Sequence, residues 1–181
     1  MGDYISNPVM DVILSRRSTK DYQRGVQISD AELSTILTAG IWAPTARNTQ
    51  HIRFYVIQNP EVISTIAKNF SDFAFNDGKV RDFCHGAPTF IMLTGKTDSN
   101  YLDVDAGIAV ENMSLAAESL GLGSVIIGCL KNYFESEDGR KYASTLGIPE
   151  DHTFSIGIAV GQIATPPQAK PRVENRITFI K

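Results

Sequence analysis

The chain has 181 residues, of which 43% are hydrophobic and 20% charged, proportions that are ordinary for one soluble globular domain with a buried core. Its net charge of −3 argues against a nucleic-acid-binding protein, and no apolar run approaches the ~18 residues that cross a membrane. The start, Met1-Gly2-Asp3-Tyr4, lacks the basic and apolar regions of a signal peptide. We therefore expect a single cytoplasmic domain over residues 1–181, with neither nucleic acid nor membrane as a partner.

The two cysteines, Cys84 and Cys129, lie far apart and form no CxxC pair, so the sequence predicts neither a zinc site nor an iron–sulfur cluster. We expect both to be buried free thiols. The three histidines are scattered, and the adjacency of Cys84 and His85 does not by itself make a catalytic pair. The sequence therefore predicts no metal site.

Periodicity predicts alternating helices and strands. Pro8 at a first helical position opens a helix over 8–16. Ser29 and Glu32 form a capping-box pattern that opens a second helix, which should stop near Ala43-Pro44 because the residue before proline avoids the helical region. The other predicted elements are a polar loop over 44–51, strands Arg53–Gln58, Pro88–Thr94, Val125–Leu130 and Thr153–Val160, helices over 61–70, 102–120 and 134–145, and an irregular aromatic-rich segment over 71–86. The alternation alone favours a βαβ-type parallel sheet.

Two segments indicate a homodimer. The helix over 102–120 is apolar around most of its circumference, which is typical of a helix buried on more than one side. A strand-like Arg176–Ile180 ends an arm tethered by Pro166-Pro167 and has poor local partners. Adding itself to the sheet edge of another subunit is one way to satisfy its backbone.

A basic cluster, Arg16-Arg17-Ser18-Thr19-Lys20, holds three cations and two hydroxyls without an intervening acid. Arginine presents a planar fork that suits phosphate oxygens, and a hydroxyl adds a further donor. The cluster predicts a seat for a phosphorylated ligand, although a solvated surface turn has the same pattern.

The loop after the second helix carries Asn48, an amide that can donate and accept at once. Such an amide suits the pyrimidine edge of a flavin, and it is equally common in ordinary turns. Gly121, Gly123 and Gly128 match neither the Rossmann nor the P-loop order; Gly121 reads as a helix cap. Gly128 lies in the predicted strand, where glycine marks a bulge or a close approach of ligand to backbone.

Together these segments resemble the FMN-dependent nitroreductase family across nearly the whole chain. Four matches carry the resemblance in the family's order, namely Arg16-Arg17-Ser18-Thr19-Lys20, Ala43-Pro44-Thr45-Ala46-Arg47-Asn48-Thr49-Gln50, Asp105-Ala106-Gly107 with Asn112 and the helix end Leu115–Gly123, and Gly157-Ile-Ala-Val-Gly161 followed by Lys170-Pro171-Arg172. The resemblance implies an α+β fold with a mostly antiparallel or mixed central sheet flanked by helices. It also implies a homodimer in which the C-terminal strand is exchanged.

The resemblance also assigns cofactor-binding roles. The FMN phosphate would be held by Arg16, Ser18 and Arg172, with Arg17 and Lys170 in the same set. Lys20 would lie near N1 and O2 of the flavin ring, where a cation stabilises the anionic reduced form. The other implied ring contacts are Asn48 at the pyrimidine edge, the backbone of Ile127 and Gly128 near N5 and O4, and Pro44, Thr45 and Ala46 from the second subunit.

The implied activity is electron transfer from NADH or NADPH through FMN to a nitroaromatic, quinone or related small acceptor, in a ping-pong sequence. We assign no side chain as a catalytic acid or base, because the cofactor carries the chemistry. Two alternatives stay open: a flavin-binding or storage protein without turnover, and a relative with different flavin chemistry, such as flavin fragmentation or dehalogenation. Many relatives have Gln-Pro-Trp where this chain has Gln50-His51-Ile52, and the short Gly95–Tyr101 stretch leaves no room for a large lid.

Overall fold

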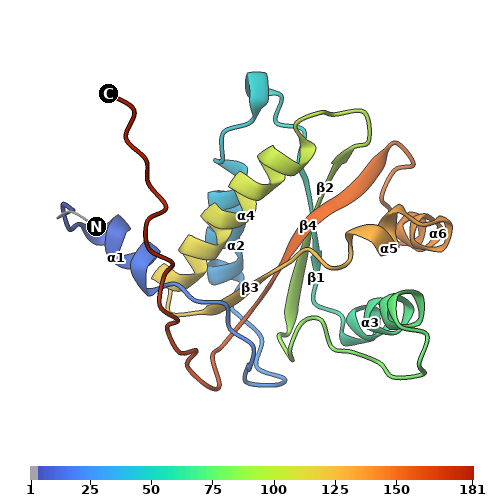
Figure 1. The fold of residues 1–181 in the computed structure, drawn as a ribbon. Coiled ribbons are helices and arrows are strands. Elements are labelled where there is room, and N and C mark those ends of the chain that lie inside the picture. Colours follow the sequence, from blue (N-terminus) through green and yellow to red (C-terminus); the bar gives the residue numbers. More distant parts are fainter. Residues whose placement is uncertain (1–3) are drawn as a thin grey trace.

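A computed structural model describes residues 4–181; Met1–Asp3, on which part of the argument against a signal peptide depends, lie outside the described residues. The fold has three layers (Figure 1). A four-stranded sheet lies between helices α2 (Asp30–Ile41) and α4 (Leu102–Ser119) on one face and α3 (Pro60–Ala74), α5 (Lys131–Glu135) and α6 (Glu137–Thr145) on the other. Within residues 4–181, no helix combines the length and apolar character needed to cross a membrane.

The sheet has the strand order β1-β2-β4-β3, and every neighbouring pair is antiparallel. Its strands are β1 (Arg53–Ile57), β2 (Thr89–Lys96), β3 (Gly123–Ile127) and β4 (His152–Gly161). The antiparallel sheet implied by the family resemblance is confirmed, and the parallel βαβ sheet suggested by the alternation is wrong. Alternation of helices and strands does not fix strand direction. Here residues 75–88 return the chain after α3 to the end of the sheet at which β1 finishes, so β2 runs antiparallel to β1.

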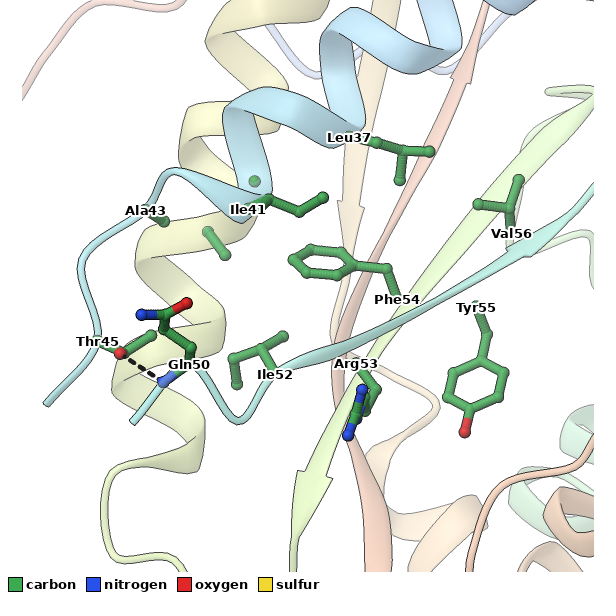
Figure 2. Close-up of a pocket in the computed structure, with 12 residues that line it drawn as sticks. Leu37, Ile41, Ala43, Thr45, Gln50, Ile52, Arg53, Phe54, Tyr55 and Val56 are labelled. Atoms are coloured by element: carbon green, nitrogen blue, oxygen red, sulfur yellow. Dashed lines mark hydrogen bonds between the residues drawn. The ribbon is translucent and has the colours of Figure 1, made fainter. Parts of the chain in front are cut away.

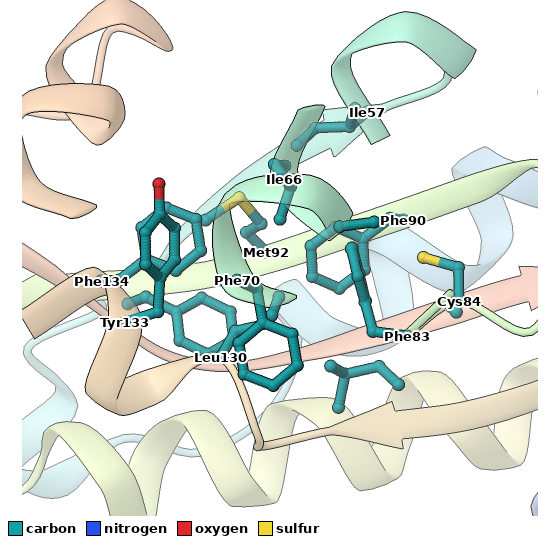
Figure 3. Packing of buried hydrophobic residues seen from close by; sticks show 14 of the residues in the cluster. Ile57, Ile66, Phe70, Phe83, Cys84, Phe90, Met92, Leu130, Tyr133 and Phe134 are labelled. Carbon is teal, nitrogen blue, oxygen red and sulfur yellow. The ribbon is translucent and has the colours of Figure 1, made fainter. Parts of the chain in front are cut away.

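The two faces of β2 enter separate hydrophobic clusters. Phe90 and Met92 pack with residues of α3 and α5, as Figure 3 shows, whereas Ile91 and Leu93 pack against residues of α2 and α4. A strand with period-2 side chains can be apolar on both faces only when both faces are covered. The core therefore lies on both sides of the sheet.

The helices that frame the candidate site begin and end close to their predicted bounds. Helix α1 covers Pro8–Ser15, and the capping box of α2 is complete, since Ser29 and Glu32 exchange backbone and side-chain hydrogen bonds. After α4, Gly121 has φ +75°, and the Leu122 N–H donates to the carbonyl of Ala117 at 2.9 Å. This is the glycine helix cap that the sequence predicts.

Other elements differ from prediction. Helix α3 reaches Ala74, so residues 71–74 are helical rather than irregular. The predicted helix over 134–145 is two helices, because Ser136 is extended and its hydroxyl accepts from Gly139 N–H at the start of α6. Strand β3 ends at Ile127, so Gly128 follows the strand and does not lie inside it. The segment 176–180 is exposed and forms no strand within this chain.

Candidate functional site: a basic groove and a separate strained loop

The N-terminal basic cluster and the C-terminal arm form one groove. Its volume is about 580 Å³. The five cations and the serine that line it come from sequence positions more than 140 residues apart, and all six had been predicted: Arg16, Arg17, Ser18, Lys20, Lys170 and Arg172. Asp21, Thr165 and Gln168 also line it and were missed, because nothing in the sequence marks them apart from ordinary loop residues.

The segment 18–20 lies beside β3. The Thr19 N–H donates to the carbonyl of Ser124 at 2.9 Å, and Ser18 pairs with Ser124 in an isolated parallel bridge. Thr19 is buried, whereas Ser18 and Lys20 are exposed. Because extended backbone alternates its side chains between two sides, Ser18 and Lys20 share the side that faces the groove.

The C-terminal arm is held to the same place by a short antiparallel contact. Tyr22 pairs with Ile163, and the Thr165 hydroxyl donates to the Asp21 carboxylate at 2.6 Å. These contacts fix the chain just before Lys170 and Arg172. The arm therefore brings two more cations to the cluster.

The two neighbouring arginines have different partners. Arg17 donates through Nη1 to the carbonyls of Leu14 and Arg16, both at 2.7 Å, so it satisfies groups at the end of α1. Arg16 contacts Glu111 through Nε at 3.5 Å. That contact leaves the Nη edge of the Arg16 guanidinium for an anion in the groove.

The loop between α2 and β1 is strained and tightly bonded. Arg47, Asn48 and Gln50 have φ values of 55°, 55° and 49°, the left-handed region that side chains other than glycine rarely occupy. The Thr45 hydroxyl accepts from the Gln50 N–H at 2.9 Å (Figure 2), and the Asn48 side-chain oxygen Oδ1 accepts from Gln50 Nε2 at 3.0 Å. Asn48 is exposed, and its amide nitrogen bonds no described residue.

This loop does not reach the groove of its own chain. Figure 1 shows it beside the N-terminal end of α4, whereas segment 16–20 lies towards the C-terminal end. The described residues that line the groove include none of the other predicted ring contacts, which are Pro44, Thr45, Ala46, Asn48, Ile127 and Gly128. Thr45 lines a different cavity of about 590 Å³ between α2 and β1 (Figure 2).

Gly128 and Cys129 follow β3 at the surface. No described atom lies within 4 Å of the position that a Cβ on Gly128 would take, so this backbone is open to approach. Cys129 is exposed, which corrects the expectation that both thiols are buried; Cys84 is buried as expected. The error has a simple cause, since β3 ends two residues before Cys129 and the buried strand pattern ends with it. Among residues 4–181 no group of three or more histidine, cysteine or acidic side chains is placed to hold a metal ion.

The nitroreductase family model matches residues 13–162, which include the basic cluster, the strained loop and all four strands. The chain belongs to the nitroreductase family. This confirms the resemblance drawn from the four motifs.

Individual nitroreductase relatives match over most of their length. The NADPH-flavin oxidoreductase of Vibrio harveyi is 28% identical over 92% of this chain and 70% of its own. The NADPH-dependent FMN reductase of Bacillus subtilis is 27% identical over 96% of this chain and 73% of its own. A crystal structure of a nitroreductase from Bacteroides fragilis with bound FMN has a TM-score of 0.87 and 27% identity, and covers 97% of this chain and all of that one.

Proposed function

We propose that this nitroreductase is an FMN-dependent oxidoreductase that takes electrons from NADH or NADPH and passes them to a nitroaromatic, quinone or related small acceptor. The carrying observation is the groove, in which five cations and a serine hydroxyl converge from the two ends of the chain. The similar Bacteroides fragilis protein binds FMN, and the similar Vibrio harveyi and Bacillus subtilis proteins are named for NADPH-dependent flavin reduction.

The donor set of the groove fits the phosphate end of FMN. A phosphate carries up to two negative charges and several acceptor oxygens, and arginine forks with a hydroxyl are strong donors to it. Arg16, Ser18 and Arg172 would hold the phosphate, with Arg17 and Lys170 adding positive charge nearby. The Nη edge of Arg16 is the better placed of the two neighbouring forks, since Arg17 already bonds two carbonyls.

FMN, when bound, supplies the two-electron redox chemistry that links the nucleotide to the acceptor in a ping-pong sequence. The chain's own side chains would bind FMN and tune the charge on its ring. Lys20 lies on the groove side of its segment, and its ammonium would favour an anionic ring. The exposed Asn48 amide would donate to the pyrimidine edge, and the open backbone at Gly128 would admit the ring edge.

A second copy of the chain is needed to bring the loop to the groove, because the two lie at different ends of α4 within one copy. Exposed apolar side chains on three neighbouring helices supply a surface for that copy. They are Val9, Ile13 and Leu14 on α1, Ile41 and the following Trp42 at the end of α2, and Val104 and Ile108 on α4. Pro44, Thr45, Ala46 and Asn48 would then face the groove of the partner.

In such a dimer, the C-terminal segment would bind the sheet edge of the partner. β1 is an edge strand. The cavity beside it is lined by Leu37 and Ile41 of α2 and by Phe54 of β1 (Figure 2). Ile177 and Phe179 are two residues apart and exposed, so they share one face of an extended strand. Added to the β1 edge of the partner, this face would fill the cavity while the backbone gains hydrogen bonds.

The direct test is the visible spectrum of the purified protein, before and after incubation with FMN, followed by anaerobic addition of NADH or NADPH. We expect a yellow protein that is bleached by at least one nucleotide and recovers its colour when an acceptor is added. A protein that cannot be loaded with FMN would refute the proposal. Bound flavin that neither nucleotide reduces would indicate a binding or storage protein instead.

A further inference from the structure

One buried carboxylate holds the strained loop in place. Asp105, near the start of α4, is 2% exposed. Its two oxygens accept from the Ala46 N–H at 3.0 and 3.1 Å, and Oδ2 also lies 2.9 Å from His51 Nε2. Among the described residues, the polar contacts of residues 44–51 outside the loop itself all end on this carboxylate.

The His51 ring is fitted to this contact. It packs against Gly95, where an added Cβ would lie 3.2 Å from His51 Nδ1 and 2.6 Å from Leu102 Cδ1, so the glycine leaves space that the ring and Leu102 share. His51 Nδ1 is buried without a hydrogen-bond partner in the described structure. Nε2 is therefore the atom through which the ring acts, and it acts on Asp105.

Left-handed residues other than glycine persist only where the surroundings over-determine them, and they cluster at functional positions. Here three such residues, Arg47, Asn48 and Gln50, lie between the two groups that Asp105 binds, Ala46 and His51. Both ends of the strained stretch are thus pinned to a single side chain. The stretch holds Asn48 exposed, with its side-chain oxygen Oδ1 accepting from Gln50 and its amide nitrogen bonded to no described residue.

We propose that Asp105 and His51 are positioning residues that fix the loop conformation in which Asn48 meets the flavin held by the groove of the second subunit. The inference rests on the proposed function, and it deepens that function by assigning a role to two residues that touch neither the groove nor the cofactor. The buried carboxylate of Asp105 on α4 would then determine where the Asn48 amide meets the flavin ring.

The test measures FMN dissociation constants for the full-length wild type, His51→Phe and His51→Gln. Phenylalanine keeps the ring against Gly95 but cannot bond Asp105, and we expect FMN to bind about tenfold more weakly, the usual order for losing one hydrogen bond to a buried charge. Glutamine can donate an amide N–H to the carboxylate, so His51→Gln should recover most of the affinity. His152→Phe is the matched control, because His152 is a similarly buried ring that lies 2.8 Å from the exposed Asp151, outside the loop, and its loss should leave FMN binding unchanged.

A mixing experiment separates a role in the second subunit from a general loss of stability. Arg16→Ala damages the groove and His51→Phe damages the loop, so a hybrid dimer of the two should contain one doubly damaged site and one intact site. We expect such hybrids to bind one FMN with wild-type affinity, although neither parent does.

The outcomes are distinct. A wild type that does not bind FMN would overturn the proposed function itself. A wild type that binds FMN while His51→Phe binds it equally well would overturn only the positioning role. Weakened His51→Phe whose hybrids recover no tight site would show that the loop does not serve the other subunit, and would overturn the inference as stated.

Discussion

Replacing Arg16 by alanine tests the groove most directly. Its guanidinium contacts Glu111 through Nε, and the pair is partly exposed, so breaking that pair costs at most about 1 kcal/mol of folding free energy. A charged hydrogen bond to phosphate is worth roughly 1.5–3 kcal/mol. Because the Glu111 contact uses Nε, it need not be given up on binding, and nearly all of that amount should appear in the FMN affinity. At about 1.4 kcal/mol for each factor of ten, the dissociation constant should rise roughly tenfold to a hundredfold.

The assay is a fluorescence titration of FMN against the flavin-free protein, with thermal unfolding measured on the same samples. Arg17→Ala is the matched comparison, because Arg17 caps the end of α1 through two carbonyls. It should lower the unfolding temperature more than Arg16→Ala does and weaken FMN binding less. The difference between the arginine variants should shrink as salt is added, since exposed charges are screened. Equal FMN affinities for wild type and Arg16→Ala, or a larger effect of Arg17→Ala, would refute the assignment.

Four further outcomes are expected. Lys20→Met should slow reduction by the nucleotide more than it weakens FMN retention, and unchanged stopped-flow reduction rates would exclude a tuning role. Gly128→Ala should leave thermal stability unchanged, because a Cβ there meets no described atom, yet reduce FMN affinity; equal affinity would mean that the ring edge lies elsewhere. The Lys131 ammonium, with a serine hydroxyl, lowers the pKa of Asp103 below its ordinary 3.8, so this carboxylate stabilises the fold above that pH and the contribution is lost as the pH falls further. Asp103→Asn should therefore show a flatter fall in unfolding free energy with acid, and an unaltered acid profile would show that the ion pair contributes nothing. Deleting residues 173–181 should shift sedimentation from dimer towards monomer and release FMN; a truncated protein that stays dimeric would exclude strand exchange as its basis.

Local rules predicted the starts and stops of α1, α2 and α4 well, because the signals are local. Ser29 and Glu32 carry their own capping box, and Gly121 carries its own helix end. The basic cluster over residues 16–20 was also recognisable in the sequence. Its convergence with Lys170 and Arg172 was expected only from the family resemblance, since no periodicity links residues 150 positions apart.

The misses come from non-local causes. The direction of β2 depends on the end of the sheet to which the long 75–88 connection returns the chain, and alternation of elements cannot encode that. Gly128 and Cys129 were placed inside a strand because Val125–Ile127 are apolar, whereas the antiparallel pairing with β4 stops at Ile127. The role of Asp105 was hidden for a different reason: its partners, Ala46 and His51, are more than fifty residues away, and one of them is a backbone N–H that no side-chain pattern marks.

Helix α4 contacts one half of each of the two proposed sites, the loop that would serve the partner's groove and the groove of its own chain. Asp105 on this helix holds the loop, and Glu111, six residues later, contacts Arg16 of the groove. At 1.5 Å and about 100° per residue, this spacing sets both the distance and the angular offset between the two attachment points. Losing or gaining one residue between them would rotate one attachment by about 100° relative to the other. Length changes that loops elsewhere absorb should therefore be disallowed within residues 106–110, because the helix sets the spacing between the two sites of the proposed dimer.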